Sequence, residues 1–209
     1  MTYTRRALIV IDVQQEYFDG PLAVHHPPRE ESLANIATAI DDAEAAGLPI
    51  VVVQHEAPAG APVFAEGSEG WRLHPVIAER ETPAWKRSTK SVASVFADAS
   101  VVTWLRDLEV ETVTLVGYMT NNCVIGSAAA AEPLGLDVEV LSDATGAIHL
   151  ANEAGTVSAR QLHETLMVLL HSNFAAVTTT AAWSRAASTS TPIAKSDLLT
   201  SATQGAAAA

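Results

Sequence analysis

Four short stretches of the chain are almost continuously apolar, and most of them are rich in valine and isoleucine. They cover residues 7–13, 50–53, 112–116 and 138–141. An apolar run without strict alternation is typical of a strand that is buried on both faces, as the strands of parallel sheets are. The pattern therefore predicts a central parallel β-sheet.

Helical patterns lie between and after these runs, over residues 30–46, 100–108, 122–132 and 152–173. Gly47 and Gly135 stand where helix C-caps are expected, and Pro133 ends the third of these helices. Strands that alternate with helices through right-handed crossovers form a doubly wound α/β fold, with helices on both faces of the sheet. In such a three-layer sandwich the functional site lies at the carboxyl ends of the strands.

Two segments depart from the alternation. Residues 55–90 contain four prolines and three glycines, which predicts a long excursion over the carboxyl edge of the sheet. After Trp183 the sequence is rich in serine, threonine and alanine. We therefore expect one folded domain over residues 1–183 and a tail over residues 184–209 that is mobile or packed on a neighbouring subunit.

Composition and charge narrow the class of protein. A chain of 209 residues with 48% hydrophobic residues can bury one full core. Its net charge of −12 and pI of about 4.9 repel phosphate backbones and anionic lipids, so no nucleic acid or membrane partner is expected. A single cysteine cannot form an internal disulfide. The apolar run at residues 7–13, which Asp12 interrupts, is too short for a membrane span and poorly shaped for a signal peptide, so we expect a cytoplasmic location.

Three side chains that can carry chemistry fall at or near predicted strand ends. Asp12 interrupts the first apolar run and is either a general base of raised pKa or a cap for the following turn. Cys123 opens a predicted helix, whose dipole would lower the thiol pKa, although a free cysteine is otherwise a core residue. A nearby ammonium would lower that pKa further, and Lys90 is the candidate, with Lys86 and Arg87 as alternatives on position alone.

Other chemistries have little support in the sequence. The seven histidines show neither HExxH nor paired-ligand spacing, and no glycine-rich phosphate loop of the GxGxxG or GxxxxGK[ST] type occurs. Metal catalysis and nucleotide binding are therefore disfavoured. The best interpretation is an enzyme that uses Cys123 as a nucleophile.

Three segments resemble the signature segments of the isochorismatase-like cysteine hydrolases. They are ALIVIDVQQEYF, the lysine in TKSVASVF, and GYMTNNCVIGSAAAAEPLGLDVEVLSDATGA, and HETLMVLLHSNFAAVTT resembles the last helix and strand of the family. The resemblance runs from about residue 7 to residue 177 and implies a six-stranded, mostly parallel Rossmann-like sheet. It also implies a catalytic triad of Asp12, Lys90 and Cys123. It further implies a cis peptide bond between Tyr118 and Met119, with the backbone N–H groups of Met119 and Cys123 forming an oxyanion hole.

The resemblance also implies a reaction. In amidases of this family the cysteine attacks a carbonyl, the aspartate moves a proton to the leaving amine, and water releases the acid from a thioester. We expect hydrolysis of a C–N bond in a small amide or ureido compound, without metal or cofactor. Cys123 argues against isochorismate, because the true isochorismatases lack the cysteine. Nicotinamidases bind a metal through Asp-x-His and a later histidine, whereas His55 and Ala57 stand at the first two positions here and only Trp71 and His74 match.

The substrate pocket and the partners are less defined. The candidate pocket residues are Phe18, Phe64, Trp71, Tyr118 and Thr120, of which Thr120 would also brace the turn before Cys123. The habit of the family and the apolar helix over residues 162–170 favour a homodimer or a homotetramer. Two other functions stay open, namely a nicotinamidase and a redox-sensing or non-catalytic thiol protein on the same fold.

Overall fold

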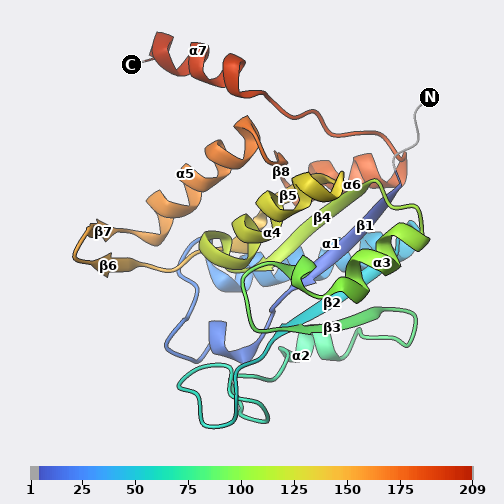
Figure 1. Ribbon diagram of the computed structural model, residues 1–209, viewed down its shortest axis with the longest axis vertical. Helices are drawn as coiled ribbons and strands as arrows, with labels where there is room; N and C mark the ends of the chain where they lie inside the picture. The colour runs from blue at the N-terminus through green and yellow to red at the C-terminus, as the bar shows by residue number, and fades with distance from the viewer. Residues whose placement is uncertain (1–4, 209) are drawn as a thin grey trace.

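The computed structural model describes residues 5–208, and its centre is a six-stranded sheet with the order β3-β2-β1-β4-β5-β8 (Figure 1). The strands are β1 (Arg6–Ile11), β2 (Ile50–His55), β3 (Lys86–Lys90), β4 (Thr112–Tyr118), β5 (Asp137–Gly146) and β8 (Ala176–Thr178). All five ladders are parallel. The four apolar runs of the sequence are the four inner strands, so the predicted α/β sheet is confirmed.

Helices cover both faces of this sheet and complete the three layers. One face carries α1 (Arg29–Ala45), α2 (Pro75–Ala78) and α6 (Thr180–Ser188), and the other carries α3 (Ala99–Asp107), α4 (Ile125–Ala131) and α5 (Ala159–Ser172). The last helix, α7 (Leu198–Ala208), follows an extended segment and lies beside α5 (Figure 1). Among the helices of residues 5–208, none combines the length and apolarity that a bilayer crossing requires.

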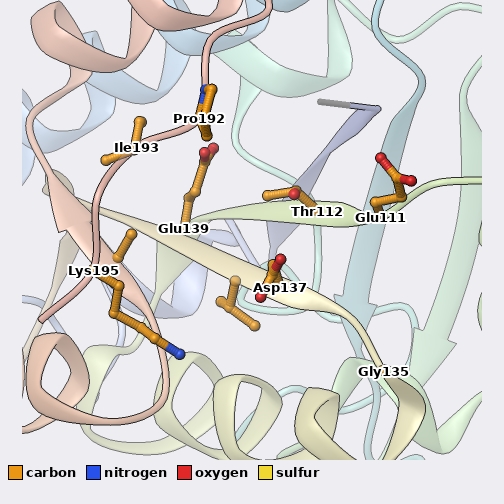
Figure 2. Close-up of a pocket in the computed structure, with 10 residues that line it drawn as sticks. Glu111, Thr112, Gly135, Asp137, Glu139, Pro192, Ile193 and Lys195 are labelled. Carbon is orange, nitrogen blue, oxygen red and sulfur yellow. The ribbon is translucent and has the colours of Figure 1, made fainter. Parts of the chain in front are cut away.

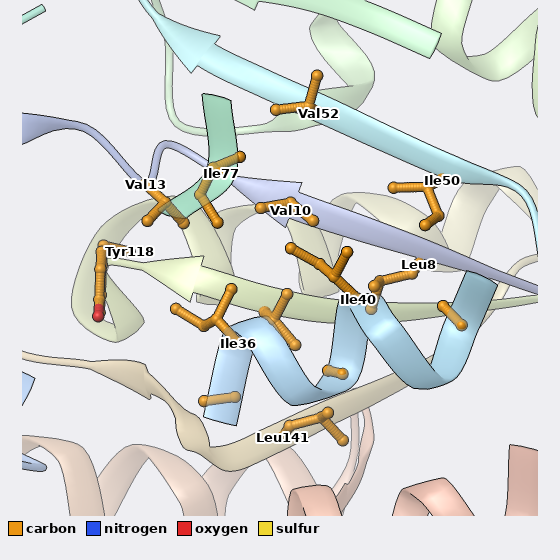
Figure 3. Packing of buried hydrophobic residues seen from close by; sticks show 14 of the residues in the cluster. Leu8, Val10, Val13, Ile36, Ile40, Ile50, Val52, Ile77, Tyr118 and Leu141 are labelled. Atoms are coloured by element: carbon orange, nitrogen blue, oxygen red, sulfur yellow. The ribbon is translucent and has the colours of Figure 1, made fainter. Parts of the chain in front are cut away.

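Successive side chains along each inner strand point to opposite faces of the sheet and so belong to two separate hydrophobic cores. In Figure 3, Leu8 and Val10 of β1 pack against Ile36 and Ile40 of α1. The intervening residue Ile9 points to the opposite face, where α3, α4 and α5 lie. Each fully buried aliphatic side chain of this size contributes about 1.5–3 kcal/mol relative to exposure. Burial on both faces explains why these strands show no polar alternation in the sequence.

Two of the expected elements have different limits. The helix expected over residues 152–173 begins only at Ala159, because a hairpin of β6 (Leu150–Asn152) and β7 (Gly155–Val157) precedes it. Ser158 then caps α5 by accepting the N–H of Gln161 at 3.2 Å. The excursion also ends earlier than expected, because residues 86–90 form the edge strand β3.

The excursion between β2 and β3 lies over the carboxyl edge, as predicted. Backbone N–H groups of Gln15 and Glu16, which follow β1, donate to the carbonyl oxygens of Arg72 and Gly70. The expected boundary after residue 183 falls inside α6, where Trp183 is fully buried. The outermost parts of the two expected segments, residues 1–4 and 209, lie outside the described residues.

The amino edge of the sheet holds a buried ion pair. Arg6 of β1 donates to Glu139 of β5 from Nε at 3.0 and 2.9 Å and from Nη2 at 2.8 Å. Thr114 and Trp183 donate to the same carboxylate at 2.8 and 3.1 Å. A cavity of about 570 Å³ opens beside it, between the starts of β4 and β5 and the segment that leads to α7 (Figure 2). This cavity lies at the opposite end of the sheet from the predicted site residues.

Candidate active site

Asp12 directly follows β1 at the carboxyl edge. Its φ of 50° lies in the left-handed region, which aspartate tolerates better than most residues do. Its backbone N–H donates to the carbonyl oxygen of Val53 at 2.9 Å, which ties it to β2. The side chain is fully buried, and Oδ2 accepts from Lys90 Nζ at 2.5 Å, whereas Oδ1 has no hydrogen-bond partner within residues 5–208.

Lys90 ends β3 and lies beside His55 in the ladder between β2 and β3. Its Nζ is 2.5 Å from Asp12 Oδ2, 3.2 Å from Cys123 Sγ and 3.2 Å from His55 Nδ1. An ammonium has three N–H donors, so these three atoms match its capacity. The two alternatives lie elsewhere, since Lys86 is at the amino end of β3 and Arg87 pairs with Glu81 at 3.0 Å.

Cys123 lies in a wide π-type turn, Thr120–Val124, between β4 and α4. The turn is brought against β1 by Gly117, which has a φ of +106°. A Cβ at that position would be 2.1 Å from the carbonyl oxygen of Ile11, so only glycine allows this approach next to Asp12. The peptide bond between Tyr118 and Met119 is cis, as the family resemblance implies.

Buried hydrogen bonds hold this turn. Thr120 Oγ1 lies 3.0 Å from His163 Nδ1, and the other ring nitrogen of His163 lies 3.0 Å from the carbonyl oxygen of Ser142. Ser127 Oγ donates to the carbonyl oxygen of Cys123 at 2.6 Å. Thr120 therefore braces the turn as expected. His163 was not predicted, because a histidine inside a helical pattern gives no signal of its contact with a distant loop.

Burial dominates the electrostatics of the site. It raises the pKa of the Cys123 thiol to about 12, with a further rise from the Asp12 charge and an opposing effect of Lys90. The expected lowering of this pKa is wrong, because Cys123 is only 1% exposed and its burial outweighs the Lys90 charge. Burial also raises the pKa of Asp12, against the opposing charge of Lys90.

These pKa shifts define the resting state of the thiol and identify Asp12 as the candidate proton acceptor. At neutral pH the thiol keeps its proton, and a carboxylate oxygen of Asp12 lies within 4.8 Å of Sγ. A carboxylate of raised pKa accepts a proton more readily than an ordinary aspartate does. The arrangement can therefore transfer the thiol proton to Asp12 when a substrate takes up the electron pair of sulfur.

Five aromatic or histidine rings that surround this edge form a continuous arc with Tyr118. The ring centroids of neighbours are 4.9 Å apart for His55 and Phe64, 5.3 Å for Phe64 and Tyr17, 5.5 Å for Tyr17 and Tyr118, 5.8 Å for Tyr118 and Phe18, and 4.4 Å for Phe18 and His74. Three of the predicted pocket residues, Phe18, Phe64 and Tyr118, belong to this arc. Tyr17, which the sequence did not single out, joins them at its centre and is buried.

The predicted pocket residues differ in how far their polar atoms are engaged. The hydroxyl of Tyr118 lies 2.7 Å from that of Ser32 on α1, on the face shown in Figure 3. Trp71 has a buried Nε1 without a hydrogen-bond partner within residues 5–208, and its carbonyl oxygen accepts from Gln14 and Gln54, both at 2.7 Å. The indole of Trp71 therefore offers an unused donor, and the hydroxyl of Tyr118 does not.

The residues of the site do not fit a metal ion. Within residues 5–208, Asp12, His55 and Cys123 form the single group of three side chains with ligand atoms within 4.8 Å of one another. Lys90 Nζ contacts all three residues, so its ammonium takes the position of a cation. At the positions of the nicotinamidase metal motif, Ala57 has no ligand atom, and His74 Nδ1 accepts the N–H of Val76 at 3.2 Å.

Several known proteins are similar to this chain in sequence or in structure. A family model described as the isochorismatase domain matches residues 6–182. A provisionally assigned isochorismatase from Burkholderia xenovorans is 45% identical, with a TM-score of 0.95 over 99% of each chain. A secreted isochorismatase effector from Verticillium dahliae is 36% identical over 66% of this chain and 71% of its own length. A nicotinamidase from Escherichia coli is 25% identical over 69% of this chain and 84% of its own.

Proposed function

Because this chain belongs to the isochorismatase family of hydrolases, we propose that it is a cysteine hydrolase that cleaves a C–N bond of a small amide or ureido compound. Cys123 is the nucleophile in this proposal. The observation that supports it most directly is the contact of one ammonium, Lys90 Nζ, with both Asp12 Oδ2 at 2.5 Å and Cys123 Sγ at 3.2 Å. A nucleophile, a proton acceptor and a fixed positive charge thus share one buried site.

In the first half of the proposed reaction, Asp12 takes the proton of the thiol as Sγ bonds to the substrate carbonyl carbon. The π electrons of the carbonyl move to oxygen, where the N–H groups of Met119 and Cys123 would stabilise the negative charge. The C–N bond then breaks, and Asp12 returns the proton to the leaving nitrogen. The acyl group stays on Sγ as a thioester, and Lys90 stabilises the thiolate character of sulfur on the way.

In the second half, water attacks the thioester carbonyl and gives a proton to Asp12. The C–S bond breaks, and Asp12 returns that proton to sulfur, so the thiol is restored. The net change is an amide plus water to an acid plus an amine. Because Cys123 is 1% exposed, a substrate reaches it only when neighbouring side chains or the excursion move.

The other functions have weaker support. A redox sensor needs an accessible thiol of low pKa, whereas burial raises the pKa of Cys123. A nicotinamidase of the metal-binding type needs the Asp-x-His pair of metal ligands. In this chain His55 stands at the aspartate position and Ala57 at the histidine position. We therefore keep a metal-independent amide hydrolysis, with Phe18, Phe64 and Trp71 as candidates for contact with the acyl group.

The test is the replacement Cys123→Ala, assayed by ammonia release from a panel of small amides and ureido compounds. We expect a loss of at least about 10³-fold in turnover of every compound that the native protein hydrolyses. A matched control is Val168→Ala on α5, because this residue is 72% exposed. Ammonia release by Cys123→Ala at the native rate, with an unchanged unfolding midpoint, would disprove the mechanism.

A further inference from the structure

His55 has no role in the proposed reaction, yet both of its backbone hydrogen-bonding groups are held by one buried side chain. The side-chain amide of Gln14 bonds both of its backbone groups, because Nε2 donates to the His55 carbonyl oxygen at 2.8 Å and Oε1 accepts the His55 N–H at 2.8 Å. Gln14 is fully buried and also donates to the carbonyl oxygen of Trp71. A buried amide thus takes the place of a strand partner at the end of β2, which fixes the imidazole next to Lys90.

The imidazole completes the set of acceptors around the ammonium. Lys90 Nζ has one carboxylate acceptor, one sulfur acceptor and His55 Nδ1 at 3.2 Å. Since an ammonium can only donate, the nitrogen that faces it must be the unprotonated one, and the ring proton must be on Nε2. Burial and the Lys90 charge lower the pKa of His55 to about 4, so the ring stays neutral at physiological pH and can keep this role.

The cluster therefore depends on His55 in a definite way. Asp12 holds Lys90 from one side, but its short contact alone would let Nζ turn away from sulfur. A third acceptor restricts Nζ to the position where it also contacts Sγ. We propose that His55 is a positioning residue that holds the Lys90 ammonium between Asp12 and Cys123. Its role in catalysis rests on the function proposed above, whereas the contact itself can be tested without a substrate.

The first experiment is long-range ¹⁵N–¹H NMR of the histidine side chains. We expect His55 to show the Nε2–H tautomer at pH 7 and to stay neutral at pH 5. In Lys90→Met the pKa of His55 should rise, because one of the two causes of its lowering is removed. An Nδ1–H tautomer in the native protein would overturn the proposal. Besides Lys90, the other titratable side chains at or next to the cluster are Asp12, Cys123, Tyr17 and Glu16.

The second experiment measures the rate of alkylation of Cys123 by iodoacetamide at pH 8.5, which mass spectrometry assigns without ambiguity because the chain has one cysteine. His55→Leu should slow alkylation about tenfold, since a displaced ammonium stabilises the thiolate less. Easier access would speed the reaction, so a decrease cannot come from a more open site. His55→Asn, whose amide oxygen can accept from Lys90, should recover most of the rate.

His74→Leu is the matched control, because this histidine also lies on the aromatic arc but caps α2 and has no hydrogen bond to Lys90. It should leave the alkylation rate unchanged. If His55→Leu is alkylated at the native rate with its fold intact, the positioning role is disproved. If the NMR and alkylation results hold while Cys123→Ala keeps amide hydrolysis, only the proposed function fails.

Discussion

Two buried ion pairs lie at opposite ends of the same sheet, and they are built differently. At the amino edge, both oxygens of Glu139 accept hydrogen bonds, from the forked guanidinium of Arg6 and from Thr114 and Trp183. At the carboxyl edge, Asp12 uses one oxygen for Lys90 and leaves the other without a partner within residues 5–208. The first pair is saturated, and the second has unused capacity.

Under the proposed function, this difference separates an ion pair with a structural role from an ion pair that takes part in the reaction. A planar guanidinium bound to a carboxylate by several hydrogen bonds has a fixed geometry. Because a guanidinium stays protonated, no proton transfer is expected at this pair. A lysine ammonium is a point charge that can serve a carboxylate, a thiol and an imidazole together. Burial without full hydrogen bonding raises the pKa of Asp12. We therefore expect substitutions at the two ends to affect different properties of the protein.

The largest effect is expected for Asp12→Asn at the carboxyl edge. The amide keeps an acceptor for Lys90 but cannot take the thiol proton, so kcat/KM for a hydrolysed amide should fall about 10³-fold. Asp19→Asn is the control, because Asp19 follows the same strand but is exposed. A loss of less than tenfold in steady-state assays would show that Asp12 is not the proton acceptor.

The next effect is expected at the amino edge, on stability and not on turnover. Glu139→Gln leaves Arg6 buried without its counter-charge, which should lower the free energy of unfolding by about 3–5 kcal/mol in urea titrations. The control is Glu109→Gln, whose pair with Arg5 is exposed and should contribute less than about 1 kcal/mol. If Glu139→Gln loses activity in proportion to Asp12→Asn while still folded, the comparison between the two ends is wrong.

A smaller effect is expected from acidification, which should lower the free energy of unfolding through His163 near the carboxyl edge. Burial lowers the pKa of His163 to about 4 in the folded protein, whereas an unfolded histidine has its ordinary value near 6.5. The neutral form is favoured by folding, so this contribution is complete above pH 6.5 and is lost as the pH falls towards 4. The free energy of unfolding should decrease by at most a few kcal/mol over that range.

His163→Gln is needed to isolate this contribution, because on acidification the lowered pKa of His55 acts in the same direction and the raised pKa of Asp12 acts in the opposite direction. The dependence of stability on pH between 6.5 and 4 should be flatter in this variant than in the native protein. Equal slopes in the variant and in the native protein would mean that the buried imidazole does not titrate as described.

The central part of the fold is predictable because its physical cause is local. Strands with both faces buried must be largely apolar, so residues 7–13 and 112–116 can be recognised as strands from the sequence alone. The edge strand β3 was missed because its sequence, KRSTK, is polar and only Ser88 and Lys90 are buried. The hairpin before α5 was missed because Gly155 lies inside a helix-like pattern, and its φ of +144° depends on the turn.

The dependence on tertiary contacts also decides which site residues can be predicted from the sequence. Had β3 been recognised, the rule that sites lie at carboxyl strand ends would have chosen Lys90 over Lys86 without any family resemblance. Tyr17, His55 and His163 could not be chosen, since their roles depend on distances between segments that the sequence does not encode as a pattern. The thiol pKa was predicted in the wrong direction because burial, which decides it, is a property of the whole fold.

The ladder between β2 and β3 pairs His55 with Lys90, although they are 35 positions apart in the chain. The intervening residues are thus a loop whose two ends are fastened to each other by strand hydrogen bonds. Strand pairing therefore fixes both ends of the loop, and the carbonyl groups of Gly70 and Arg72 are held in addition by the backbone N–H groups of Glu16 and Gln15. For protein engineering, substitutions of the loop side chains Phe64 and Trp71 would vary the proposed acyl contacts while these backbone attachments stay in place.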